Sequence, residues 1–410
     1  MDTAKRPQDS HISSGMVPAV ISGNEPYFKE KIYITRPNLP DSSELMPRME
    51  EMLARKWVTN FGHFHNELKE KLEKAIGVKH VLPCCNGTIG LFLLLKALDL
   101  KGPVITTPFT FPATIHAISM AGCQPLFCDI DPDNYSLCPK SVAKNINKNV
   151  SAILAVNVFG NISDTEALER IGDKYGIPVI YDSAHSFMSS CKGKMSGTFG
   201  KAEMFSFHAT KLFTTLEGGA ITTNDDALFN RLKLMINFGI KDEDHVVDVG
   251  LNGKMTELNA IFGLIAFDKV KGIIEKMSGL AQIYRTRLSA IPGIKSQKIR
   301  EGCKVNNQYM AVEVISEEFG LTRDELYRVL KMDNVYARKY FFPAGQDYDC
   351  YKDMGFAGST KLPVTEKVSS RILCLPIYNS LEASDVNKIC DLLSSINRHS
   401  PEIKKKLKGA

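Results

Sequence analysis

The chain has 410 residues, 44% of them hydrophobic, and a formal net charge of +5 from 51 Lys and Arg against 46 Asp and Glu. This length and hydrophobic share are sufficient for a sizeable buried core, which excludes a disordered chain or a small disulfide-stapled protein. The mild positive charge is far below that of a dedicated nucleic-acid-binding protein, so we expect no nucleic acid partner.

Membrane and secretion signals are the next features that the sequence can test. The apolar run over residues 89–95 ends at Lys96, well short of the roughly 18 residues that a membrane span needs. Near the N-terminus, charged residues precede only a broken apolar stretch, which does not resemble a signal peptide. We therefore expect a cytoplasmic protein with no membrane partner. Its ten cysteines, which include no Cys-x-x-Cys pair, are expected to be reduced thiols.

Strand-like and helical patterns alternate over much of the chain. Residues 1–30 are polar and contain Gly, Pro and Ser, so we expect a flexible N-terminal arm. Helices are predicted at about 43–55, 63–76, 88–98, 114–121 and 165–175, and strands at about 81–85, 103–107, 124–129, 152–157, 178–182, 202–207 and 219–223. This alternation predicts an α/β fold, and continuously apolar strands such as 153–156 indicate a largely parallel sheet that is buried on both faces.

The rest of the chain begins with a long helical stretch at about 255–288. A strand near 308–314 and helices at about 323–332 and 383–397 are predicted after it. We place a domain boundary inside the long helix. Residues 31–265 then form a large domain, and residues 266–410 form a small C-terminal α/β domain.

Asn86-Gly87-Thr88 lies between a predicted strand and a predicted buried helix. A glycine turn at a helix N-terminus exposes backbone N–H groups, and the helix dipole favours an anion at that end. Such a junction also carries Gly-Thr simply as a turn and a cap. The motif is therefore a candidate anion site, with a purely structural turn as the alternative.

Asp182 stands at the carboxyl end of a predicted parallel strand and is followed closely by His185. This edge of an α/β sheet is where ligands bind. Two alternatives compete: Asp182 caps a helix, or Asp182 and His185 are ligands of a metal ion. No third ligand lies nearby at a supporting spacing, so we predict no metal site.

Lys211 follows another predicted strand, which ends near Ser206, and precedes the Gly218-Gly219 pair of the next strand. Most lysines are solvated surface groups. Between buried strands, however, desolvation and cationic neighbours lower the pKa of a lysine and make its amine nucleophilic. Phe111, at a further strand end, is either a core residue or an aromatic surface for a flat ring.

These features have an order that one cofactor explains. Pyridoxal 5′-phosphate needs an anion-binding turn, a stacking aromatic ring, a carboxylate opposite its pyridine nitrogen and a lysine. On this interpretation the turn and Ser206 hold the phosphate, Asp182 keeps the ring nitrogen protonated, and Lys211 forms the Schiff base and then moves protons.

At this point the sequence resembles the sugar aminotransferases of the DegT–StrS type, within the fold-type I pyridoxal-phosphate enzymes. The resemblance covers nearly the whole chain after about residue 32. Its motifs are Ile34-Thr35-Arg36-Pro37, Trp57 to Gly62, Asn86-Gly87-Thr88, Asp182 to His185, Ser206 to Lys211, Glu217-Gly218-Gly219 and Gly250 to Leu258. Their order and spacing together make the match specific.

The resemblance implies a fold-type I architecture, with a large three-layer domain around a mixed, mostly parallel sheet. It also implies transfer of an amino group, usually from glutamate, to a 3-keto or 4-keto group of a nucleotide-linked 6-deoxy hexose. Pyridoxamine phosphate is then the intermediate form of the cofactor.

The same resemblance assigns roles to residues. Lys211, Asp182 and His185 become catalytic residues, and Gly87, Thr88, Phe111 and Ser206 become cofactor ligands. Asn252 is expected to reach the phosphate of a second chain, so a homodimer is the minimal active unit.

Rival functions remain at this stage. A dehydratase branch of the family has histidine in place of the lysine, and Lys211 therefore favours transamination. An amino-acid transaminase is a second alternative, although no clear arginine pair for two carboxylates is visible. A non-enzymatic cofactor-binding regulator is a third, and no nucleic-acid-binding module supports it.

Overall fold

The computed structural model describes residues 17–23, 25–352 and 361–408. Its centre is a seven-stranded sheet in the order β2-β10-β9-β6-β5-β3-β4. The strands are β2 (His80–Cys84), β3 (Val104–Thr106), β4 (Pro125–Phe127), β5 (Ala152–Val156), β6 (Val179–Asp182), β9 (Ala202–Ser206) and β10 (Gly219–Thr223). Strand β10 runs in the direction opposite to the other six strands, so the predicted mixed, mostly parallel sheet is confirmed.

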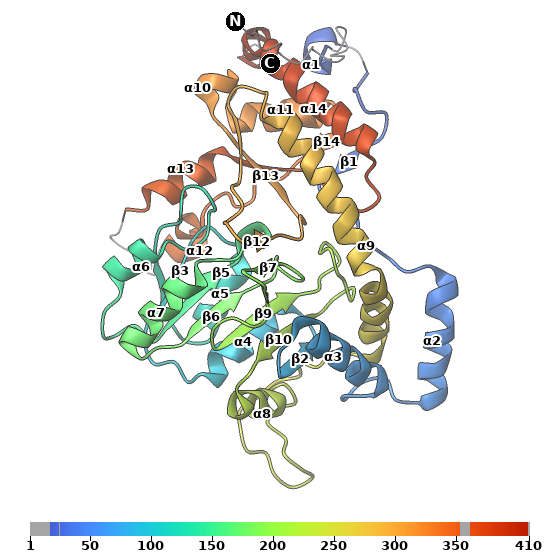
Figure 1. The fold of residues 1–410 in the computed structure, drawn as a ribbon, viewed down its shortest axis with the longest axis vertical. Coiled ribbons are helices and arrows are strands. Elements are labelled where there is room, and N and C mark those ends of the chain that lie inside the picture. Colours follow the sequence, from blue (N-terminus) through green and yellow to red (C-terminus); the bar gives the residue numbers. More distant parts are fainter. Residues whose placement is uncertain (1–16, 24, 353–360, 409–410) are drawn as a thin grey trace, which may run out of the picture.

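Helices cover both faces of this sheet, which makes three layers (Figure 1). The first face packs on α4 (Gly87–Ala97), α5 (Pro112–Met120) and α8 (Asp226–Met235), and the second on α3 (His63–Ile76), α6 (Pro139–Asn145), α7 (Thr165–Tyr175) and α9 (Glu257–Leu288). Strand β5 illustrates the cause, because Ala152 and Leu154 belong to one core cluster and Ile153 and Ala155 to the other. A strand with apolar residues on both faces is stable only between two helical layers.

The C-terminal part follows α9, which runs without a break through the predicted boundary at residue 265. One half of α9 packs on α2 (Ser42–Arg55) and α3, and the other half packs on α14 (Ala383–Arg398). A small antiparallel sheet contains β11 (Ile294–Ser296), β13 (Met310–Val314) and β15 (Ile372–Leu375). Around it lie α10 (Ser316–Phe319), α11 (Arg323–Met332), α13 (Pro363–Arg371) and α15 (Ser400–Lys408), whereas α12 (Asp349–Lys352) contacts α5 through Tyr351 and His116. The helices predicted at 63–76, 165–175 and 323–332 have these bounds in the structure.

The described part of the expected N-terminal arm is held against this C-terminal part. The backbone N–H groups of Ala19 and Tyr27 both donate to Oδ1 of Asp333, at 3.2 and 3.1 Å. Phe28 is buried, and α1 (Ala19–Ser22) contacts α11 and α15. Residues 17–23 and 25–30 are therefore packed on the fold, and residues 1–16 lie outside the described residues.

The expectation that all cysteines are reduced thiols is wrong for one pair. Cys191 and Cys303 form a disulfide across β7 (Ser190–Cys191) and β12 (Cys303–Lys304), with β8 (Lys194–Met195) completing a small sheet. The two cysteines are direct partners in the antiparallel register although 112 residues separate them in the chain. Sequence spacing alone does not reveal such a pairing.

Four short elements complete the description. Strand β1 (Ile32–Tyr33) pairs in parallel with β14 (Val335–Tyr336), and two 3-10 turns span Val158–Gly160 and Gly345–Asp347. Among the described residues no helix is long and apolar enough to cross a bilayer.

Candidate active site

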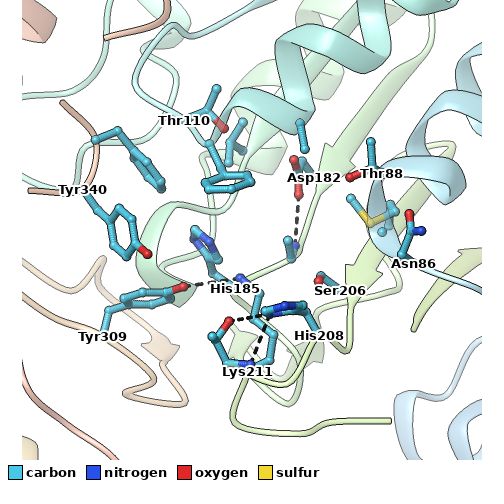
Figure 2. A pocket seen from close by; sticks show the side chains of 18 of the residues that line it. Asn86, Thr88, Thr110, Asp182, His185, Ser206, His208, Lys211, Tyr309 and Tyr340 are labelled. Atoms are coloured by element: carbon cyan, nitrogen blue, oxygen red, sulfur yellow. Dashed lines mark hydrogen bonds between the residues drawn. The ribbon is translucent and has the colours of Figure 1, made fainter. Parts of the chain in front are cut away.

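A cavity of about 630 Å³ opens at the carboxyl ends of the parallel strands. Asp182 ends β6 and Ser206 ends β9, and the α4 N-terminus and the start of α5 face the same space. The C-terminal part closes the far side with Tyr309, Arg338 and Tyr340. Figure 2 shows the lysine, the aspartate and these tyrosines directed toward one centre. Ligands of α/β proteins bind at this edge of the sheet, outside the carboxyl ends of the strands.

The turn before α4 forms one wall of this cavity. The side chain of Asn86 caps the helix by accepting the backbone N–H of Ile89 at 2.9 Å. A Cβ on Gly87 would lie 2.9 Å from Sδ of Met204 and 3.1 Å from Cβ of Ser206, so a larger residue would have to displace these side chains where α4 approaches β9. The first-turn N–H groups, the Thr88 hydroxyl and Ser206 then surround a space that suits an anion.

Asp182 is 5% exposed, and both of its carboxylate oxygens have donors. Thr114 donates its hydroxyl to Oδ2 at 2.7 Å, and the backbone N–H of Ala184 donates to Oδ1 at 3.1 Å. Burial raises the pKa of this carboxyl, while the two hydrogen bonds and the charge of Lys211 oppose the rise. The alternative in which Asp182 caps a helix is excluded, because turns rather than a helix follow β6.

Lys211 lies in a turn after β9, inside the cavity. Its Nζ donates to the hydroxyl of Tyr309 at 3.3 Å (Figure 2). Burial lowers the pKa of the amine from 10.5 to about 8, and the negative charge of Asp182 limits the fall. With this pKa roughly one amine in ten is deprotonated at pH 7, far more than for an exposed lysine, and the deprotonated amine is the nucleophile.

His185 is 6% exposed and presents an aromatic face to the cavity. Its Nδ1 accepts the backbone N–H of Phe159 at 3.3 Å, and its ring stacks within 6° of Phe341 with the ring centres 5.8 Å apart. Burial and the charge of Lys211 hold the pKa of this imidazole well below its usual range, so the ring is neutral. Among the described residues no three His, Cys, Asp or Glu side chains are grouped as a metal site.

Phe111 and Asn252 differ in where the structure places them. Phe111 is the N-cap residue of α5 and lines the cavity with 52% of its surface exposed, so it is not a core residue. Asn252 does not line the cavity of its own chain. Its backbone pairs with Asn237 at the base of the loop between α8 and α9, which projects from the body of the molecule (Figure 1).

Two residues that contact the predicted ones were missed from the sequence. Thr114 was assigned only to a helix, yet it is the donor to Asp182. Tyr309 was assigned only to a strand, yet it contacts both Lys211 and the ring of His185, with centroids 4.7 Å apart in the second case. Tyr309 is 98 residues from Lys211 in the chain, so no local pattern connects them.

The comparisons with known proteins agree with this geometry. The sequence profile of the DegT/DnrJ/EryC1/StrS aminotransferase family matches residues 41–394. The chain belongs to this aminotransferase family, whose members depend on pyridoxal phosphate. The arrangement fits that cofactor: an anion-binding helix end, a buried carboxylate, aromatic surfaces and a lysine of lowered pKa line one cavity.

Individual relatives cover nearly the whole chain. The dTDP-4-amino-4,6-dideoxy-D-glucose transaminase of Escherichia coli is 38% identical, over 88% of this chain and 98% of the relative. The enzyme of the same name from Shigella dysenteriae is 36% identical, over 90% of this chain and 100% of the relative. The crystal structure of DesI in the presence of its TDP-sugar product superposes with a TM-score of 0.89 at 32% identity, covering 94% of this chain and 98% of that one. The fold-type I architecture is therefore confirmed.

Proposed function

We propose that this chain is a pyridoxal-phosphate-dependent aminotransferase that moves an amino group from glutamate to the 4-keto group of a nucleotide-linked 4-keto-6-deoxy hexose. The observation that carries the proposal is the single cavity in which Lys211 and Asp182 face the α4 N-terminus. The names of the relatives support the sugar and the position of the amino group. Glutamate as the donor follows from the family resemblance.

Different residues of the cavity would bind different parts of the cofactor. Gly87, Thr88 and Ser206 would hold its phosphate, since they surround the anion-binding end of α4. Asp182 would lie opposite the ring nitrogen and keep it protonated, while Phe111 and His185 would contact the ring as aromatic surfaces. When bound, pyridoxal phosphate supplies an electron sink and carries the amino group between the two substrates.

Lys211 would hold the cofactor covalently and, once released, would move a proton at its Nζ. The lowered pKa lets this amine both accept and return a proton near neutral pH. The Tyr309 hydroxyl at 3.3 Å would keep Nζ directed into the cavity. Burial raises the pKa of Tyr309, so this hydroxyl stays protonated while the lysine titrates.

We further propose that the active unit is a cytoplasmic homodimer in which Asn252 reaches the cavity of the second chain. The loop between α8 and α9 carries exposed apolar side chains, with Phe238 48%, Val246 71% and Val249 85% exposed. Apolar side chains gathered on one projecting loop favour burial against another protein surface.

The direct test is an assay of the holoenzyme with glutamate and a panel of acceptors. We expect amination of dTDP-4-keto-6-deoxyglucose and little or no reaction with 3-keto-sugar nucleotides or free keto acids. Turnover of keto acids alone would favour the amino-acid transaminase alternative. Loss of a sugar hydroxyl without amino transfer would favour a dehydratase. Cofactor binding without turnover of any donor would favour a regulator.

A further inference from the structure

A buried carboxylate lies next to the turn that follows β6. Glu203 belongs to β9, is 0% exposed and does not line the active-site cavity. In the parallel register it pairs with Tyr181, the residue before Asp182. A carboxylate without access to water is unfavourable unless hydrogen bonds compensate it. No step of the proposed reaction uses this group, so its contacts indicate what it does.

Three donors fix the Glu203 carboxylate. The hydroxyl of Ser183 donates to Oε2, and the hydroxyl of Ser196 donates to the same oxygen at 3.1 Å. The backbone N–H of Phe199 donates to Oε1 at 2.7 Å. Burial raises the pKa of Glu203 to about 7, and these hydrogen bonds oppose the rise. The carboxylate is therefore mostly ionised at pH 8.

The hydrogen bonds of Glu203 reach both ends of the turn at residues 183–186. At its start, the Ser183 hydroxyl contacts Glu203 directly. At its end, the hydroxyls of Ser186 and Ser196 share a hydrogen bond of 2.8 Å, and Ser196 is itself a donor to Glu203. All three serines are 0% exposed, so no water competes for these bonds. One carboxylate thus holds the turn from two sides.

The segment between these ends carries two groups of the active site. The backbone N–H of Ala184 donates to Oδ1 of Asp182 at 3.1 Å, and His185 lines the cavity. Thr114 donates only to the other carboxylate oxygen, Oδ2. The position of the Ala184 N–H therefore determines one of the two hydrogen bonds that orient Asp182.

We propose that Glu203 is a positioning residue for the Asp182 carboxylate. Its hydrogen bonds hold the turn, the turn directs the Ala184 N–H, and that N–H orients Asp182 in the cofactor site. Glu203 has no surface in the cavity, so its effect on the reaction passes through the turn. This inference rests on the proposed function, because that function places Asp182 opposite the ring nitrogen of the cofactor.

The first test is the titration of Lys211 in the cofactor-free protein, followed by pH-dependent modification of its amine. The charge of Asp182 raises the pKa of Lys211, so a displaced or protonated Asp182 should lower that pKa. We expect Glu203→Gln and Ser183→Ala each to lower it by about half a unit or more. Ser183→Ala leaves the Glu203 charge in place, so its shift is no direct effect of that charge. It also keeps the test available if Glu203→Gln does not fold.

The second test is steady-state kinetics of the holoenzyme at pH 8. Each single variant should lower kcat about three- to tenfold, while the KM for the sugar nucleotide changes less than about twofold, because neither residue lines the cavity. The double variant should match Glu203→Gln alone, since both substitutions act on the same turn. Glu313→Gln is the matched control. Glu313 is 4% exposed and accepts the Tyr135 hydroxyl at 2.9 Å outside the active-site cavity, so its variant should leave kcat and the Lys211 pKa unchanged.

Three results would overturn the inference: a Lys211 pKa in both single variants equal to that of the wild type, an equal shift in Glu313→Gln, or losses of kcat that multiply in the double variant. The titration needs no substrate, which separates this failure from failure of the proposed function. If the single variants titrate like the wild type while the wild-type holoenzyme aminates a keto-sugar nucleotide, the role of Glu203 is wrong and the function stands. If no keto-sugar nucleotide is aminated while the Lys211 pKa responds as expected, the function is wrong and Glu203 still positions Asp182.

Discussion

Replacing Lys211 with methionine is expected to stabilise the cofactor-free protein at neutral pH while it abolishes transamination. The lysine carries its charge in a buried position, where burial lowers its pKa from 10.5 to about 8. This shift means that the fold disfavours the protonated amine. Methionine has a similar length and no charge, so it fills the same space without that penalty.

The magnitude follows from the pKa. At 1.36 kcal/mol per pH unit, the penalty on the charged lysine is about 3 kcal/mol below pH 8, where both the folded and the unfolded chain are protonated. Between pH 8 and 10.5 the folded chain loses the proton and the unfolded chain keeps it, so the penalty declines. Above pH 10.5 the amine is neutral in both states and the penalty is absent. We expect a net gain of about 1–3 kcal/mol at pH 7, because Asp182 loses its neighbouring positive charge in the variant.

Denaturant unfolding of the cofactor-free protein, at pH 7 and at pH 9.5, measures this difference between variant and wild type. The gain should be about 2 kcal/mol smaller at pH 9.5 than at pH 7. Lys140→Met, at an exposed position in α6, is the matched control and should give no such pH-dependent gain. A Lys211→Met variant that is less stable than the wild type at pH 7, or whose gain does not change with pH, would refute the assignment of Lys211 as a buried amine of lowered pKa.

Three further changes probe the cofactor site. Asp182→Asn removes the carboxylate, so transamination should fall about 10²–10³-fold. The pKa of Lys211 should also move below 8, because the negative charge that opposes its fall is lost. A pH profile of amine modification in the cofactor-free protein checks this second effect. Gly87→Ala should weaken binding of pyridoxal phosphate at least tenfold, because the added Cβ would lie 2.9 Å from Met204 Sδ. Gly272→Ala is the control, since a Cβ there would have no atom within 4 Å, and it should leave the affinity for the cofactor unchanged. Fluorescence titration measures both affinities. Tyr309→Phe removes the hydroxyl beside Lys211 and should lower kcat about two- to tenfold with unchanged cofactor content; an equal loss of bound cofactor would contradict a role confined to the lysine.

The sequence was sufficient where function depends on local order. Strand ends are visible as apolar runs followed by polar residues, and Asp182 and Ser206 stand at two of them. Parallel strands bring their carboxyl ends to one edge, so the residues predicted to hold the cofactor, apart from Asn252, meet in one cavity. A Cβ on Gly87 would crowd Met204 and Ser206 of β9, a packing constraint that the turn motif did not indicate from the sequence.

The sequence was insufficient where a feature depends on contacts between distant segments. Tyr309 reaches Lys211 only because the C-terminal part of the chain lines the far side of the cavity. The Cys191–Cys303 pair depends on the register of two strands of two residues each, which have no periodicity to detect. Part of the expected arm is fixed by Asp333, more than 300 residues away, through hydrogen bonds to backbone groups that every sequence has.

The central claim is that this cavity transfers an amino group from an amino acid to a nucleotide-linked keto-sugar through Lys211. The most direct measurement incubates the holoenzyme with ¹⁵N-glutamate and dTDP-4-keto-6-deoxyglucose and follows the label by NMR. We predict ¹⁵N at carbon 4 of the sugar nucleotide, with no label transferred by Lys211→Ala. An unlabelled sugar in the presence of fully loaded wild-type enzyme, or equal labelling by wild type and Lys211→Ala, would contradict the account.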